Sequence, residues 1–180
     1  MASSIVRLTF DNGDTSFTQN LLKFNNDYQV LAQQFTVGQG FTLDKVSISL
    51  KKTGSPTGTM TLAIHSDSSN DPSGSVITNG TANTSSESAL STSYGYIDFT
   101  FAVNPALAQG TKYHLVLSSN RANSETNYVE WAQSNGAEDY TGGVSNRQDT
   151  GLTWTEVAGD FHFKIYGPPA GGGAFIFNTL

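Results

Sequence analysis

The sequence predicts an all-β fold: a two-sheet antiparallel jelly-roll β-sandwich with a flexible C-terminal tail. First, many short runs of β-branched and aromatic residues are separated by Gly, Asn and Ser, which is typical of strands joined by turns. Second, apolar and polar residues alternate within these runs, as they do in a strand that buries one face. Third, no segment keeps a helical period over three turns, and residues 18–26 have room for one or two turns at most.

The predicted sheets are organised around residues 41–67, which we expect to form two strands joined by a tight turn. The turn, residues 53–58, contains Pro56, which fixes φ, and two glycines, which permit positive φ. We expect a hairpin, and because a hairpin cannot bury its own apolar face, it requires a second sheet. The alternating apolar residues are Val46, Ile48 and Leu50 in the first strand and Met60, Leu62 and Ile64 in the second.

The same alternation predicts the other strands and two long loops. The apolar parity changes between Leu43 and Val46, which indicates a bulge or corner near Asp44. The first and last strands are expected side by side, because each would otherwise expose an unpaired edge. Residues 67–88 and 134–151 are expected to be mainly irregular. The remaining strands are expected at residues 5–10, 29–37, 76–77, 96–101, 113–118, 128–133, 152–157 and 161–166.

The chain is expected to fold as one domain followed by a tail. A length of 180 residues suits one domain, and residues 1–167 carry all the predicted strands. Residues 168–180 begin with a Pro/Gly linker and end in an apolar peptide. This peptide either folds back onto its own sheet or docks on a neighbouring subunit by strand addition. The residues expected to dock are Phe175, Ile176, Phe177 and Leu180.

Composition excludes several classes of partner. The net charge is −6 and the lysines and arginines are scattered, so nucleic acid is not expected as a partner. The absence of cysteine excludes disulfides and zinc-thiolate sites. No run approaches the roughly 20 apolar residues that span a bilayer. The first residues contain no apolar signal region, so if Met1 is the initiator we expect synthesis in a cytoplasm without export by the general route.

The sequence does not predict an enzyme. It contains no nucleophile elbow, zinc-protease motif, phosphate-binding loop or dinucleotide fingerprint. The three histidines, His65, His114 and His162, fall at outward positions of the predicted strands, and we expect them to be surface residues on unrelated strands. Glu130 with Glu138 or Asp139 is the one candidate for a glycosidase-type carboxylate pair, and in an acidic protein such a pair arises readily by coincidence.

Two turns offer hard oxygen ligands for a structural calcium ion. Asp11 and Asp14 lie in one turn, and Asp67 and Asp71 lie in another. The alternative is that these residues are present because Asp and Asn are good turn formers. No other cofactor is expected.

Aromatic residues around the predicted loop at 134–151 are candidates for a shallow sugar-binding site. Trp131 shares its parity with Val129, which favours core packing. Tyr140 and Trp154, together with Tyr128, are the candidate ligand-binding residues. Structural packing is the alternative role for all three.

Five strand and turn motifs between residues 29 and 167 carry a resemblance to a known family. They are QFTVG at 34–38, LDKVSISLKKTGSPTGTMTLAIHSD at 43–67, LSTSYG at 90–95, LAQGTKY at 107–113 and GDFHFKIYG at 159–167. With these motifs the chain resembles the "choice-of-anchor R" type of β-sandwich domain, a family of bacterial surface proteins and phage structural proteins whose members are similar to carbohydrate-binding jelly rolls. The resemblance implies the fold and implies no catalytic residues.

These observations lead to two expectations of function. The first is a non-enzymatic virion structural protein of a bacteriophage, either a capsid decoration or a tail-associated subunit. Such a protein assembles in the host cytoplasm, contacts other virion subunits or further copies of itself, and can also contact host-surface carbohydrate. The alternative is a carbohydrate-binding or adhesive module of a secreted or surface-anchored bacterial protein.

Overall fold

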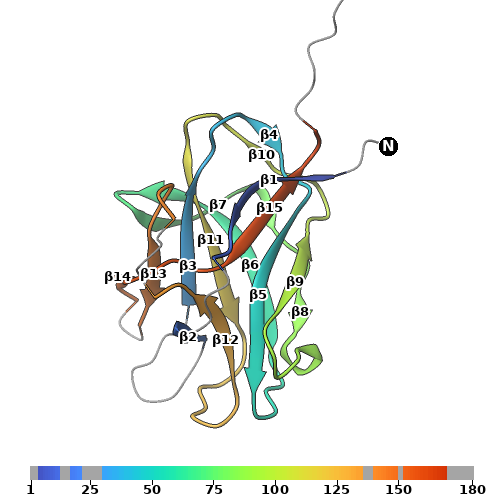
Figure 1. Cartoon of the computed structure of the whole chain (residues 1–180), viewed down its shortest axis with the longest axis vertical. Helices are drawn as coiled ribbons and strands as arrows, with labels where there is room; N and C mark the ends of the chain where they lie inside the picture. The colour runs from blue at the N-terminus through green and yellow to red at the C-terminus, as the bar shows by residue number, and fades with distance from the viewer. Residues whose placement is uncertain (1–3, 13–16, 22–29, 136–139, 150–151, 170–180) are drawn as a thin grey trace, which may run out of the picture.

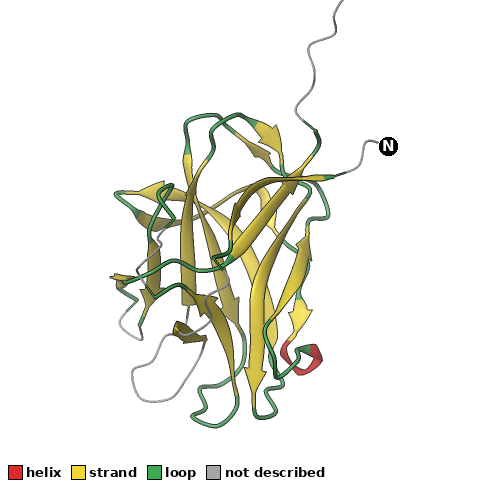
Figure 2. Cartoon of the chain, in the orientation of Figure 1, coloured by secondary structure: helices red, strands yellow, loops and turns green. Residues whose placement is uncertain are grey.

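The computed structural model describes residues 4–12, 17–21, 30–135, 140–149 and 152–169. These residues form an all-β, β-sandwich-like fold of antiparallel sheets, none of which closes on itself (Figures 1 and 2). The only helical turn in the described part of the chain is the 3-10 turn η1 (Glu87–Ala89). The predicted all-β class is confirmed.

The first sheet is built on β5 (Lys45–Thr53). One edge of β5 pairs with β9, and the other is shared by β15 along its first half and β12 along its second. β1 pairs with β15, as predicted for the first and last strands, and β2 pairs with β12. The other strands of this sheet are β1 (Ile5–Phe10), β2 (Phe17–Leu21), β9 (Gly95–Thr100), β12 (Tyr128–Gln133) and β15 (Phe163–Gly167).

The second sheet runs in the order β14-β13-β3-β11-β6-β7, with the short β8 also pairing with β6. Its longest ladders join β11 to β3 on one side and to β6 on the other. A separate ribbon joins β4 (Phe41–Thr42) to β10 (Ala106–Leu107). The strands of the second sheet are β3 (Val30–Thr36), β6 (Thr59–Ser68), β7 (Asp71–Thr81), β8 (Ser85–Ser86), β11 (Lys112–Ser119), β13 (Ser145–Gln148) and β14 (Trp154–Val157).

One hydrophobic core lies between the two sheets. Trp131 of β12 is fully buried and its ring stacks on Phe161, with centroids 4.5 Å apart, so the predicted core role of Trp131 is confirmed. Every second residue of a strand reaches the core, because successive side chains point to opposite faces. The first sheet contributes Val46, Ile48, Leu50, Phe99, Val129, Phe163 and Ile165, and the second contributes Leu31, Phe35, Met60, Leu62, Ile64, Leu115 and Leu117.

The predicted hairpin over residues 41–67 is wrong. β5 and β6 both exist, but they pair with different neighbours and belong to different sheets. The turn between them is therefore an arch that carries the chain from one sheet to the other. Period-two alternation identifies the buried face of each strand but not its pairing partner. The apolar faces of β5 and β6 are buried against each other across the core rather than side by side.

A buried ion pair fixes this arch. The carboxylate of Glu87 is fully buried and accepts hydrogen bonds from the Gly58 N–H at 2.9 Å and from Arg121 Nε at 2.8 Å. Ser119 Oγ donates a third bond at 2.7 Å. A Cβ at position 58 would lie 2.6 Å from that of Arg121 and 2.8 Å from the Glu87 carboxylate, so only glycine fits beneath the carboxylate.

Three other segments differ from the sequence-based expectation. Residues 17–21 form the strand β2 rather than helical turns. The segment 71–81 is a long strand, reached through a tight turn in which Ser69 and Asn70 have φ of 56° and 72°. Residues 145–148 form β13 between β3 and β14. By contrast, the corner predicted near Asp44 is confirmed, because β4 and β5 belong to different sheets.

Replacing Glu87 by Ala is expected to lower the free energy of unfolding by about 3–5 kcal/mol, because it leaves the guanidinium of Arg121 buried without its counter-charge. Urea unfolding of E87A and the wild type measures the difference. The double variant E87A/R121A is expected to recover part of the loss. A loss below about 1 kcal/mol in E87A, the range of an exposed pair, would contradict the role of the ion pair.

Candidate functional site

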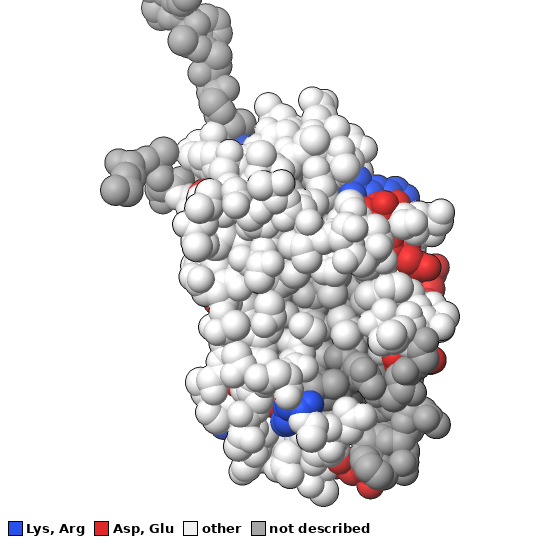
Figure 3. Space-filling model, turned by 180° about the vertical axis from the view of Figure 1, so that it is seen from behind, with Lys and Arg blue, Asp and Glu red and all other residues white. Residues whose placement is uncertain are grey.

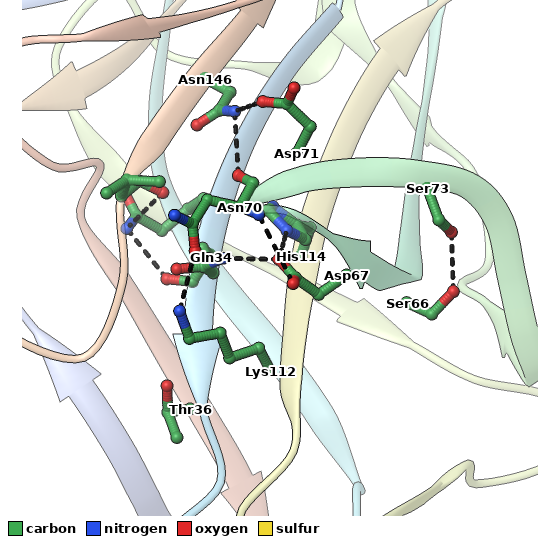
Figure 4. A network of polar contacts seen from close by, with 12 residues as sticks. Gln34, Thr36, Ser66, Asp67, Asn70, Asp71, Ser73, Lys112, His114 and Asn146 are labelled. Carbon is green, nitrogen blue, oxygen red and sulfur yellow. Dashed lines mark hydrogen bonds and ion pairs between the residues drawn. The ribbon is translucent and has the colours of Figure 1, made fainter.

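A row of polar side chains crosses the outer face of the second sheet (Figure 4). Gln34 of β3 lies opposite His114 of β11 in the ladder, and His114 lies opposite His65 of β6. The expectation that the three histidines are surface residues on unrelated strands is wrong. His114 and His162 are buried, and His65 and His114 are direct cross-strand neighbours.

Asp67, near the end of β6, and Asn70, in the turn to β7, contact this row. One carboxylate oxygen of Asp67 accepts a hydrogen bond from Gln34 Nε2 at 2.6 Å and lies 2.9 Å from His114 Nε2. The side-chain oxygen of Asn70 accepts a bond from Lys112 Nζ at 2.8 Å. The tight turn at residues 69–70 places Asp67 and Asn70 over the strands, and the network ties β3, β6 and β11 together.

The network continues to β13. Asn146 Nδ2 donates to the Asp71 carboxylate at 2.6 Å and to the Asn70 carbonyl oxygen at 3.2 Å. These two bonds from the Asn146 amide attach β13 to the β6–β7 turn.

A hollow of about 250 Å³ adjoins the network. Its lining includes Gln34, Asn70 and Lys112, together with Thr36, which donates a hydrogen bond to the Gly142 carbonyl oxygen at 2.8 Å. Residues 141–144 complete the lining. The hollow is polar, with one cationic side chain, and offers amide and hydroxyl groups that could hydrogen-bond a small polar ligand.

Two influences set the pKa values of the histidines in this row: burial and the neighbouring carboxylate of Asp67. Burial lowers the pKa of His114, and the attraction of Asp67 offsets this only in part. Burial also lowers the pKa of His65, and His114 lowers it further. Burial alone would raise the pKa of Asp67, but its hydrogen bonds to His114, Gln34 and Asn70 bring that pKa below the ordinary value. At neutral pH the pair is a carboxylate beside a neutral imidazole, whose Nε2 carries the proton.

The calcium candidates are placed differently from one another. Asp67 and Asp71 both belong to the network, where side-chain amides and an imidazole occupy their oxygens. Asp11 lies 3.5 Å from Lys164 Nζ and 3.7 Å from His162 Nδ1, and Asp14 lies outside the described residues. No group of three or more His, Asp or Glu in the described chain is arranged to hold a metal ion. Calcium binding stays a prediction.

The aromatic candidates lie on separate parts of the fold. Tyr140 packs against the core, with its ring centroid 5.2 Å from that of Phe163 and 6.0 Å from that of Phe10. Burial raises the pKa of Tyr140. Trp154 is half-buried on the edge strand β14 of the second sheet, whereas Tyr128 is half-buried on β12 of the first. Ligand binding by these three residues stays a prediction.

Gln33 of β3 and Asp160, in the irregular segment before β15, form a buried contact that sequence reasoning missed. Gln33 Nε2 donates to the Asp160 carboxylate at 2.7 Å, and the Phe161 N–H donates to Gln33 Oε1 at 2.7 Å. The other Asp160 oxygen accepts from the Tyr140 N–H at 3.0 Å. The sequence did carry a signal of this buried glutamine, because Gln33 lies between Leu31 and Phe35 at a position that the alternation assigns to the buried face of the strand.

An apolar groove of about 400 Å³ lies at the seam between the two sheets, where β1 faces the end of β3. Phe35 and Val37, both buried, form its floor. Ile5 and Val6 line it and are 42% and 44% exposed. At its rim the Arg7 guanidinium lies 5.0 Å above the centre of the Phe41 ring.

Charged groups are sparse on much of the surface. Seen from behind, the described surface is largely without Lys, Arg, Asp and Glu; most of the visible charged side chains lie along one side, and a separate basic group lies near the lower centre of the view (Figure 3). No broad basic surface is visible in this view. The candidate acid Glu130 accepts a hydrogen bond from Thr53 at 2.6 Å and pairs with Lys51 at 3.2 Å, while Glu138 and Asp139 lie outside the described residues.

Comparisons with known proteins provide no identification. No family model matches the chain, and a search of curated proteins finds no significant match. The resemblance to choice-of-anchor R domains therefore stays a prediction. Within the described residues, no helix is long and apolar enough to cross a membrane.

Acidification is expected to destabilise the protein below about pH 6.5, because the unfolded histidines bind protons that the buried His114 and the half-buried His65 do not. Their folded pKa values lie below the ordinary 6.5, so the unfolded state holds more protons in this window and stability falls as the pH falls. Urea unfolding between about pH 7.5 and pH 5 measures the slope. H114Q is expected to flatten it, since glutamine can still donate to Asp67 but does not titrate. An equal slope in both proteins would contradict the assignment.

Proposed function

We propose that this protein is a non-enzymatic structural protein of a bacteriophage virion, a capsid decoration or tail-associated subunit with a jelly-roll fold. It acts as a passive building block that binds other virion subunits or further copies of itself. Its place is the virion, assembled in the host cytoplasm.

The strand order supports the jelly-roll topology. In a jelly roll with eight strands, the first, eighth, third and sixth strands form one sheet, and the second, seventh, fourth and fifth form the other. With β1, β3, β5, β6, β7, β9, β11 and β15 taken as the eight, the observed orders β1-β15-β5-β9 and β3-β11-β6-β7 follow this rule. On this assignment β12, β13 and β14 are an insertion before the last strand.

The use of the acidic side chains supports a passive role. A general acid or base must reach a substrate proton in an accessible pocket. Glu87 is buried under the arch, Asp160 is buried between the sheets, and Glu130 is held by Thr53 and Lys51. Each of these carboxylates already accepts hydrogen bonds that stabilise the fold.

The observation that carries the proposal is the apolar groove beside β1. Exposed Ile5 and Val6 adjoin a hollow whose floor is the hydrophobic core. Edge strands with exposed apolar residues are normally protected, because they pair with other chains. A groove of this kind fits a protein whose function is to associate.

Particles released by the organism that encodes the chain provide the test. Antibodies raised against the purified protein are expected to label phage particles banded in a density gradient and viewed by immunogold electron microscopy. Antibodies against an unrelated cytoplasmic protein are the control. Label confined to the surface of the cells, with none on purified particles, would contradict the virion assignment and favour the surface-module alternative.

The alternative function, a carbohydrate-binding or adhesive module, is favoured by the polar hollow beside Gln34 and Lys112. If the hollow binds sugars, a glycan array probed with the wild type gives signals that K112A loses. The control is K52A, since Lys52 lies on β5 in the other sheet. An array without signals, or signals equal in wild type and K112A, would reject this site.

A further inference from the structure

We infer that the groove beside β1 is the docking site for residues 174–180 of a second copy of this chain, which adds an antiparallel strand to the edge of β1. This inference rests on the proposed function, since it specifies how the building block associates. It defines both the receiving surface and the segment received.

The receiving surface is a strand edge above an apolar floor. β1 is the last strand of its sheet, and within the described residues only β15 pairs with it. A strand laid along the other edge of β1 would gain backbone hydrogen bonds and would cover the exposed side chains of Ile5 and Val6 and the half-buried ring of Phe41. Strand addition of this kind combines main-chain pairing with pockets for alternate side chains.

The segment 174–180, AFIFNTL, has the composition that such a surface requires. It carries no charged side chain and contains no proline or glycine. In an extended strand Phe175 and Phe177 point to the same face. Two aromatic rings on that face match the apolar groove of about 400 Å³.

The position of the last described residues favours docking of the tail on a second copy over docking on the groove of its own chain. Gly167, the last residue of β15, lies opposite Ile5, the first residue of β1. A tail that turned back over its own β1 from this point would run in the same direction as β1. Every strand pair named in the two sheets is antiparallel, and parallel pairing is slightly less stable per residue.

The linker that precedes the tail favours the same arrangement. Pro168 and Pro169 follow β15 directly; prolines hold the chain extended and cannot donate to a ladder. The reversal required for self-docking would have to begin at these residues. The six residues 168–173 span roughly 20 Å at full extension, which allows the tail to cross to a neighbouring molecule and enter from the opposite end of β1.

The absence of cysteine allows a direct test by disulfide trapping. Two single variants, V6C and F177C, of which one carries a tag that changes its mass, are mixed and oxidised. Docking between copies is expected to form the mixed V6C–F177C disulfide at least about tenfold faster than the control pair V76C–F177C, because docking raises the effective concentration of the thiols. The control is matched, since Val6 and Val76 are both valines with 44% exposure, and Val76 lies on β7 of the other sheet.

Three outcomes would overturn the inference. In the first, the mixed V6C–F177C disulfide forms no faster than the control disulfide. In the second, no mixed disulfide forms at all. In the third, the double variant V6C/F177C forms its disulfide within one chain, while the two single variants form none with each other. Circular dichroism of each variant verifies that the fold is kept. If trapping fails although the immunogold label is found on phage particles, the docking mode is rejected and the proposed function stands.

Discussion

The structure depends on one constraint: the apolar faces of its two sheets must exclude water from the core that they share. Neither sheet closes on itself, so the core is protected only as well as its edges are covered. The arch between β5 and β6 closes one end, where the buried pair of Glu87 and Arg121 holds Gly58 in place. The segment around Asp160, held by Gln33, closes another side. At the seam beside β1, the core residues Phe35 and Val37 are buried, but Ile5 and Val6 next to them remain exposed.

The polar groups of the protein follow from the same constraint. Burying a carboxylate is costly unless hydrogen bonds or an opposite charge compensate it. Glu87 has both, because it accepts from Gly58 and Ser119 and pairs with Arg121. Asp160 accepts hydrogen bonds from Gln33 and Tyr140, and the partly exposed Asp67 accepts them from Gln34 and His114. The carboxylates are thus used to lock segments onto the sheets. This use agrees with the proposed role of a passive building block.

The sequence was sufficient for the fold class and for most strands, because period-two alternation directly reports a strand with one buried face. It identified the two strands of the central segment but not their partners, since alternation is the same for a hairpin and for an arch. β13 could not be predicted, because SNRQ at 145–148 shows no apolar alternation and is held by its pairing with β3 and β14. The burial of His114 was equally hidden, because the turn that covers it is brought there by the fold. The groove was also beyond sequence reasoning, since its lining combines β1 with residues around β3 and β4, and β1 is far from these residues in the sequence.

The account predicts that this groove and the tail act together. The most direct measurement is therefore sedimentation velocity of the full chain, compared with that of a chain that ends at Gly173. The full chain is expected to sediment faster as its concentration rises, while the shortened chain sediments as a monomer throughout. A full chain that remains monomeric at every concentration, or a shortened chain that associates equally well, would contradict the account.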